Sequence, residues 1–271
     1  MAPQVQDAME RLFNPTKPYL ASWVWIHDVD QRKFRESIDT LADHPSLPRA
    51  TALYYAVSCG LCRPAKYLIS THGQDVNAKC GTHSTPLHAA SRNGHVGAVT
   101  LLLDHGADIN MTNHNGKTPL CEAFDGRHLE VMRLLLGRRA APDVRYNFFG
   151  LLTHTASSSG QAEVVRLLPQ HSADVNATSL YNHMPLHWAS TNGHANVAQV
   201  LLDHGADINA QSDFGTPLYL ASTNYHLEAV RLLLARGADV HIRAPRGLTP
   251  FQASDDTQIS QLLLEHGAEE E

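Results

Sequence analysis

Cysteine is scarce in this 271-residue chain, which has only four, and aromatic residues make up just 7% of it. Four cysteines do not form a dense disulfide framework in a chain of this length, so we expect reduced thiols. The first thirteen residues lack the apolar core of a signal peptide, and no run approaches the ~20 apolar residues of a membrane span. These absences predict an intracellular protein, cytoplasmic or nuclear, with no membrane partner.

An excess of positive charge is also missing, because 21 Lys and Arg face 27 Asp and Glu, which gives a formal net charge of −6. No block of five or six Lys or Arg occurs, so a nucleic-acid partner is not expected. The chain has no phosphate-binding loop, His-Glu-x-x-His motif, nucleophile elbow or dinucleotide loop. We therefore expect no cofactor, and we expect that the protein is not an enzyme.

Helix start and stop signals are what the sequence does contain, as residues 85–110 illustrate. Thr85 can cap a helix, Pro86 suits the first helical position, and Gly94 permits a left-handed turn after it. Apolar residues then recur at three- and four-residue intervals until Gly106, which predicts a second amphipathic helix. The unit is therefore a helix, a tight turn and a second helix, followed by a polar loop.

The same unit recurs along the chain with a period of 32 to 34 residues. Its starts lie at Thr51, Thr85, Thr118, Leu151, Met184, Thr216 and Thr249. A fixed period of this size indicates a solenoid, in which each unit covers its apolar face by stacking on a neighbour. We predict a repeat array over residues 51–271.

The repeated phrases resemble the ankyrin repeat family. They include TPLH at Thr85–His88, MPLH at Met184–His187, and the closing phrases GADIN, SADVN and GADVH that end at Asn110, Asn209, Asn176 and His241. The resemblance implies an all-α solenoid of seven helix-turn-helix repeats with β-turn fingers.

Two places depart from the pattern. Leu151-Leu152 replaces Thr-Pro in the fourth unit, and the third unit closes with RRAAPDV (138–144), which predicts an irregular third-to-fourth junction. The seventh unit is short and ends in glutamates, as expected of a C-terminal cap with a polar end.

Residues 1–50 keep no repeat register, and we predict that they form a helical leader that caps the array. The apolar stretch Trp23–Ile26 would cover the exposed end of the first repeat, with docking to a partner as the alternative. The phrases RLFNP and WVWIHD resemble the segment that precedes ankyrin arrays in fungal signalling proteins of the NACHT class.

The family resemblance implies a scaffold or adaptor that binds another protein through the concave groove of finger tips and first helices. The partner-binding candidates in that register are Arg92, Asn93, His114, Asn115, Asp125, Tyr146, Phe148, Tyr181, His183, Trp188, Thr191, Asn192, Phe214, Thr223, Asn224 and Tyr225. Tyr and Trp supply large contact area with few rotors to freeze, which suits them to anchor a partner.

The alternative is a small-molecule-binding protein or an enzyme. Glu122 replaces an apolar residue of the motif, and Asp125, His154, Tyr181 and Trp188 could line one cavity with it. A carboxylate walled by aromatic rings could have a raised pKa suited to acid or base catalysis.

The 18 histidines have a simpler explanation, since twelve of them recur in repeat register, and for these we favour structural hydrogen bonds over catalysis. Three others, His83, His114 and His183, fall on predicted finger tips.

Two further possibilities are a zinc site and the hydroxylation of asparagines. Cys59, Cys62, Cys80 and His83 have the spacing of a zinc site, although the repeat register accounts for each position without metal. Asn77, Asn110, Asn176 and Asn209 match the position that asparaginyl hydroxylases modify in some ankyrin proteins, as the resemblance implies.

Overall fold

The computed structural model describes residues 51–79, 85–147 and 150–269, and the chain divides into two compact units that meet between Ala140 and Ala141. The predicted leader cap, including Trp23–Ile26, lies outside the described residues, as do Cys80, His83 and Phe148.

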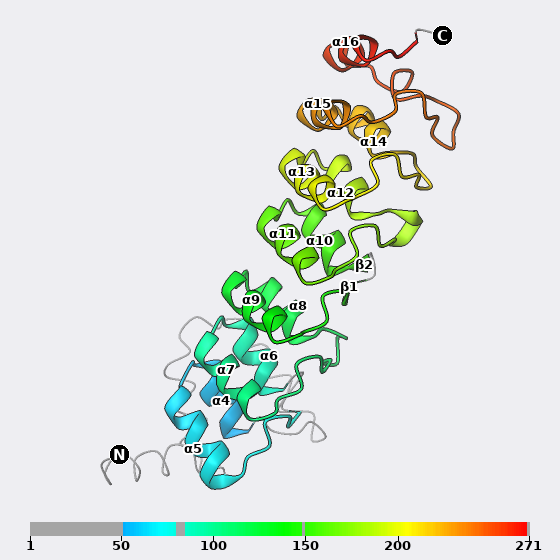
Figure 1. Ribbon diagram of the computed structural model, residues 1–271. Coiled ribbons are helices and arrows are strands. Elements are labelled where there is room, and N and C mark those ends of the chain that lie inside the picture. The colour runs from blue at the N-terminus through cyan, green and yellow to red at the C-terminus, as the bar shows by residue number, and fades with distance from the viewer. Residues whose placement is uncertain (1–50, 80–84, 148–149, 270–271) are drawn as a thin grey trace, which may run out of the picture. The chain divides into compact units, whose positions relative to one another are not determined.

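The first unit holds three helix pairs in its described part. They are α4 (Ala52–Ser58) with α5 (Cys62–His72), α6 (Pro86–Arg92) with α7 (Val96–Asp104), and α8 (Pro119–Asp125) with α9 (Leu129–Gly137). The first helices of the pairs pack on one another, as do the second helices, so the unit has two helical layers (Figure 1).

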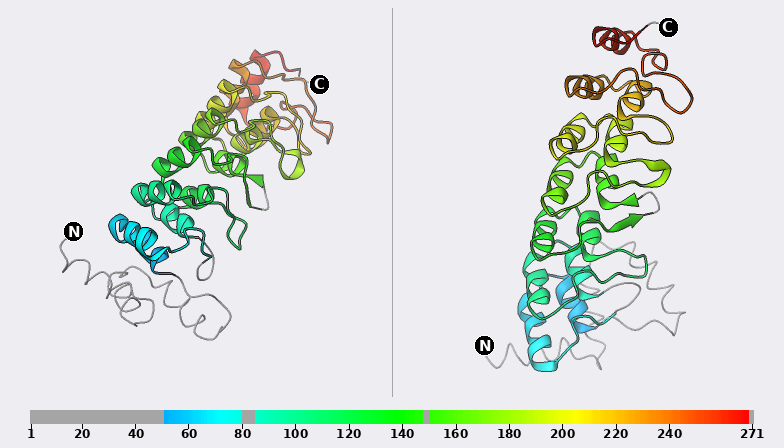
Figure 2. Two further views of the ribbon diagram at one scale, coloured as in Figure 1. Left: turned by 60° about the horizontal axis from the view of Figure 1, so that its bottom comes forward. Right: turned by 45° about the vertical axis from the view of Figure 1, so that its right-hand side comes forward.

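The second unit repeats this arrangement after a short hairpin of β1 (Arg145–Asn147) and β2 (Gly150–Leu151). Its helix pairs are α10 (Leu152–Ser158) with α11 (Ala162–Gln170), α12 (Pro185–Thr191) with α13 (Ala195–Asp203), and α14 (Pro217–Thr223) with α15 (Leu227–Ala235). A 3₁₀ turn, η1, spans Leu180–Asn182, and a single helix, α16 (Thr257–Glu265), ends the unit. We call the loop before each first helix a finger, and the fingers of this unit project to one side (Figure 2, right).

The helices begin where the sequence predicts, because the capping residue recurs. The hydroxyls of Thr51, Thr118 and Thr216 accept the backbone N–H three residues on, at 3.2 to 3.4 Å. Leu151 and Met184 have no hydroxyl to make this bond. His154 and His187 each accept the N-cap backbone N–H at 3.1 Å, as His88 also does beside Thr85 at 3.3 Å. The histidine therefore satisfies a different backbone N–H from the one that the threonine hydroxyl binds.

A leucine ladder forms the core of each unit. The third residue of the repeat start is fully buried in most repeats, as Leu53, Leu87, Leu120, Leu186 and Leu218. The fourth repeat differs, because Thr153 stands at this position with its hydroxyl buried and without a hydrogen-bond partner among the described residues. A leucine from each second helix completes the ladder, as with Leu102 in the first unit and Leu201 in the second.

The structure explains which residue occupies the left-handed position in the turn between the paired helices. Gly193 has φ 71°, and a Cβ there would lie 2.5 Å from Nδ1 of His226 in the following repeat. Tyr225 holds the equivalent place in the sixth repeat at φ 61°, where the next turn has Asp256 in place of a histidine. Glycine is therefore required where a histidine ring from the next repeat covers the turn.

Both irregular places that the sequence indicates have an altered structure. The fourth repeat opens with the β1–β2 hairpin, whose pairing is irregular between Arg145 and Asn147. In the seventh repeat the first helix shrinks to one turn, closed by Ala253 N–H on the Thr249 carbonyl. The second helix, α16, is intact because Asp256 caps it through Gln258 and Ile259.

Candidate functional site

Asparagines of the closing phrases tie neighbouring fingers together within each unit. In the second unit, Asn176 Oδ1 accepts the N–H of Asp207 at 2.9 Å, and its Nδ2 donates to the Gly205 carbonyl at 3.1 Å. Asn77 makes the same two bonds to Asp108 and Gly106 in the first unit. The closing phrase is therefore part of the scaffold, and the hydroxylation of these asparagines remains a prediction.

The repeat-register histidines are structural, as predicted. Besides capping its helix, His187 donates through Nε2 to the Ala210 carbonyl of the next finger at 3.0 Å, and His154 does so to Ala177 at 2.9 Å. A second set, His95, His194 and His226, bonds a carbonyl of the preceding repeat at 2.9 to 3.0 Å. Both ring nitrogens of His154 are engaged in this way, which counts against its role in the alternative acid–base site.

Burial keeps the capping histidines neutral. Desolvation lowers the pKa of His88 and of His154, and it lowers the pKa of His187 to about 4 with a further contribution from His183. A neutral ring can accept at Nδ1 and donate at Nε2, which is what the inter-repeat bonds require.

In the first unit, the candidate site residues belong to a network of charges around the third finger. The buried Glu122 carboxylate accepts from Arg92 Nη1 at 2.8 Å and from Asn113 Nδ2 at 2.9 Å. Lys117 pairs with Asp125 at 2.6 Å. The hydrogen bond that Arg92 donates to Glu122 is the main reason that the pKa of Arg92 is raised. Asn93, His114 and Asn115 lie exposed beside this network.

In the second unit, the candidates form an aromatic group on the fifth and sixth fingers. We call Tyr181, His183, Trp188 and Phe214 the finger cluster. The rings of Tyr181 and Phe214 meet edge to face with centroids 5.3 Å apart, and these two side chains are 51% and 44% exposed.

His183 lies at the base of the finger cluster. Its ring centroid is 5.0 Å from that of Trp188 and 5.6 Å from that of Phe214, and the ring stacks on His187 at 5.4 Å. The side chain is only 6% exposed, and neither ring nitrogen has a hydrogen-bond partner among the described residues. Desolvation lowers the pKa of His183, against an opposing pull from Asp213. The sequence placed His183 on an exposed finger tip, whereas the structure buries it.

Four further candidates lie at the ends of first helices, where their side chains also make hydrogen bonds within the fold. Thr191 and Thr223 donate to the carbonyl four residues earlier, at 2.8 and 3.0 Å. Asn192 and Asn224 do the same through Nδ2 at 2.8 Å. Tyr225 is 57% exposed, and Tyr146 is half-buried in β1.

Sequence reasoning missed the polar side chains that hold these residues in place. Ser179 accepts the indole N–H of Trp188 at 3.1 Å, and Asp213 accepts from Asn182 Nδ2 at 2.8 Å. Asn113, which orients Glu122, was also overlooked. The signal was available for two of them, because Asn113 and Ser179 stand at the same register position, nine residues before the side chain that each one binds.

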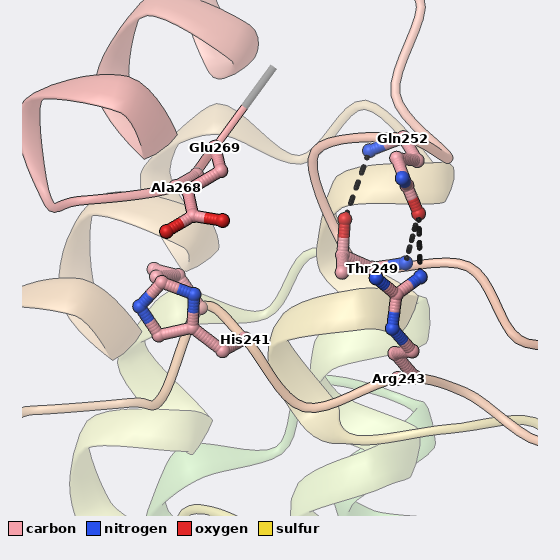
Figure 3. A pocket seen from close by; sticks show the side chains of 7 residues that line it. His241, Arg243, Thr249, Gln252, Ala268 and Glu269 are labelled. Atoms are coloured by element: carbon pink, nitrogen blue, oxygen red, sulfur yellow. Dashed lines mark hydrogen bonds between the residues drawn. The ribbon is translucent and has the colours of Figure 1, made fainter. Parts of the chain in front are cut away.

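The described part of the second unit also has a small hollow in the seventh repeat, of about 250 Å³ (Figure 3). The guanidinium of Arg243 donates to the Gly247 carbonyl at 2.9 Å and to Gln252 Oε1 at 3.2 Å, and Gln252 Oε1 also accepts the N–H of Thr249. His241 and Glu269 stand on the opposite wall (Figure 3). These bonds close the shortened first turn of the repeat, so the hollow belongs to the end of the array.

Two further findings concern only the residues that the structure describes. No group of three His, Cys, Asp or Glu side chains there could hold a metal ion, and two of the four predicted zinc ligands, Cys80 and His83, lie outside this part. No helix within it is long and apolar enough to cross a membrane.

Comparison with known proteins agrees with the fold. A family model described as "Ankyrin repeats (3 copies)" matches residues 53–148 and 150–212, and one described as "Ankyrin repeats (many copies)" matches residues 196–234. The chain therefore belongs to the ankyrin repeat family, and the all-α ankyrin solenoid predicted from its sequence is confirmed. Domains of this family are generally protein–protein interaction modules.

Two solved structures are similar over most of the chain. The human ASB11 ankyrin repeat domain matches with 25% identity and a TM-score of 0.67, covering 81% of this chain and 99% of that one. The ankyrin repeat domain of Bcl-3, described as a member of the IkappaB protein family, matches with 27% identity and a TM-score of 0.73, covering 80% and 99%. A search of curated proteins found no match.

Proposed function

We propose that this protein is an intracellular, non-enzymatic scaffold or adaptor that binds another protein through its fingers and first helices. The observation that carries the proposal is the exposed pair of Tyr181 and Phe214. Large aromatic side chains on a rigid scaffold are typical anchors for a partner, because they bury much area with little loss of side-chain entropy.

The buried polar groups support binding over the alternative of an acid–base or small-molecule site. The carboxylate of Glu122 is held by Arg92 and Asn113, and Asp125 is paired with Lys117. His154 uses both ring nitrogens within the fold. Each group therefore already has a structural role, whereas Tyr181 and Phe214 expose apolar surface that a partner could cover.

Site-specific photo-crosslinking tests this proposal. A benzophenone analogue of phenylalanine at position 181 or 214 replaces one aromatic side chain by another, and the same analogue replaces exposed Gln199 on the second helix α13 as a control. We expect protein adducts in cell extract from positions 181 and 214 and few from 199. Adducts that are absent from the fingers, or as abundant from position 199, would contradict the proposal.

A further inference from the structure

The fifth and sixth repeats differ from the rest of the chain in charge. Residues 167–230 contain no lysine or arginine, and their five acidic residues are Asp174, Asp203, Asp207, Asp213 and Glu228. Two of the five are paired with arginines outside this span, since Asp203 lies 2.9 Å from Arg236 and Glu228 lies 3.9 Å from Arg231. The other three lie in fingers, and none has a lysine or arginine partner among the described residues.

Asp213 connects this uncompensated charge to the finger cluster. Its N–H donates to the Tyr181 carbonyl at 3.1 Å, and its carboxylate oxygen Oδ1 accepts from Asn182 at 2.8 Å. It also directly precedes Phe214 in the chain. The carboxylate is thus held next to the two finger segments that carry the exposed rings, in a span without lysine or arginine.

The geometry of the rings suits a flat cation. An edge-to-face pair leaves ring faces of Tyr181 and Phe214 uncovered, and both side chains are about half exposed. An aromatic face attracts a cation, and arginine adds a planar guanidinium that stacks on the ring while donating to a carboxylate.

His183 gives a second, independent reason to expect a ligand here. The ring is buried against Phe214 and Trp188, and neither of its nitrogens has a hydrogen-bond partner among the described residues. Buried polar atoms in native proteins nearly always have one. Both nitrogens are buried, so a guanidinium on the finger cluster reaches this ring only where a covering ring turns aside, and one of its N–H groups then donates to a ring nitrogen.

We propose that the finger cluster, together with Asp213, docks a basic partner segment through an arginine side chain. This inference rests on the proposed function and deepens it by naming the chemistry of the partner. Charge complementarity supplies attraction over the fingers, the ring faces supply the preference for guanidinium, and the carboxylate fixes its orientation.

Defined peptides test the chemistry directly. The probes are fluorescein-labelled 12-residue Gly-Ser peptides that carry three arginines, three lysines or three citrullines, titrated by fluorescence anisotropy against the full chain. We expect the arginine peptide to bind tightest and the citrulline peptide to lose about tenfold or more in affinity, because citrulline keeps the shape and loses the charge. An arginine peptide that binds no better than the citrulline peptide would overturn the proposal.

Two variants separate stacking from general charge attraction. Tyr181→Ala with Phe214→Ala keeps every charge, and we expect the arginine peptide to lose about tenfold in affinity. Leu248→Ala is the matched control, because Leu248 is an apolar side chain of the loop that opens the seventh repeat and is 43% exposed, against 44% for Phe214. The control should stay within twofold of wild type. Equal losses in the two proteins, or no loss in the double variant, would refute the assignment.

Hydrogen exchange on the unaltered chain keeps the test independent of how the variants fold. The arginine peptide should slow exchange in residues 179–188 and 210–219 and leave residues 51–79 unchanged; protection elsewhere only would count against the site. The crosslinking experiment tests the proposed function separately. Adducts between the fingers and a partner segment without arginine would support the proposed function and contradict this inference.

Discussion

The third and fifth fingers use the same register positions for opposite purposes. In the third, Asn113 binds Glu122 nine residues later, and in the fifth, Ser179 binds Trp188 at the same spacing. The first pair ends in a carboxylate held by Arg92, whereas the second ends in an aromatic ring. One backbone geometry thus supports either an internal charge network or an aromatic surface.

The neighbouring position sharpens the contrast. Lys117 directly precedes the start of the third repeat and pairs with Asp125, so its charge is satisfied within the finger. His183 directly precedes the start of the fifth repeat, and neither nitrogen of its buried ring has a hydrogen-bond partner among the described residues. A finger whose polar groups satisfy one another has little left for a ligand, whereas the fifth and sixth fingers retain unpaired groups.

Lowering the pH should destabilise the second unit more than the first, and this is the largest difference that we expect between them. Desolvation lowers the pKa of three described histidines in the second unit, His154, His183 and His187, and of His88 in the first. The ordinary value is 6.5, so below that pH the unfolded chain binds protons that the folded chain does not, and stability falls.

His187 sets the size of this effect. Its folded pKa of about 4 makes the loss complete near pH 4, and from His187 alone the loss amounts to about 3 kcal/mol. Hydrogen exchange corrected for intrinsic rates, followed from pH 7 to 4, should show earlier loss of protection in residues 150–235 than in 85–140. Parallel loss in both units would show that the histidines do not distinguish them.

Removing the Glu122 carboxylate of α8, which Asn113 of the third finger binds, should have the next largest effect. Glu122→Ala leaves the buried Asn113 amide without its partner, which costs about 2 kcal/mol. Urea unfolding followed by circular dichroism measures the loss. Trp188→Phe is the counterpart in the fifth repeat, where the indole hydrogen bond to Ser179 and part of the ring are lost, and we expect about 1 kcal/mol. Equal losses would break the contrast between the fingers.

The sequence predicts the scaffold well because its determinants are local and repeated. The helix starts, the buried leucines and the inter-repeat histidines each follow from one register position. Leu151 and Met184 still begin helices without a capping hydroxyl, and a histidine binds the N-cap N–H there.

The site is less predictable, because its contacts join different repeats. Arg92 reaches Glu122 from 30 residues away, and Tyr181 meets Phe214 across two fingers. The exposure of His183 was misjudged for the same reason, since Phe214 of the next finger packs against it. Register locates a side chain on its own repeat, but the neighbouring repeat decides whether it is buried.

The aromatic pair of the second unit should show a measurable coupling. Tyr181→Ala and Phe214→Ala, made singly and together, should be non-additive by about 1 kcal/mol in the free energy of unfolding, as expected of an edge-to-face pair. Tyr225→Ala combined with Phe214→Ala should be additive. If the effects of Tyr181→Ala and Phe214→Ala on the free energy of unfolding are also additive, the two rings do not stabilise each other.

The ion pair of the third finger should give the smallest effect, and salt should reveal it. Asp125→Asn removes the attraction to Lys117, a partly exposed pair, and should cost about 0.5 kcal/mol at low ionic strength. The cost should shrink further in 1 M salt, because screening weakens such pairs. Thr191 occupies the equivalent position in the fifth repeat and donates to the His187 carbonyl, so Thr191→Val should have the same cost at either salt concentration. A salt-independent Asp125→Asn would mean that packing, not charge, holds the third finger, and the electrostatic contrast between the two fingers would then fail.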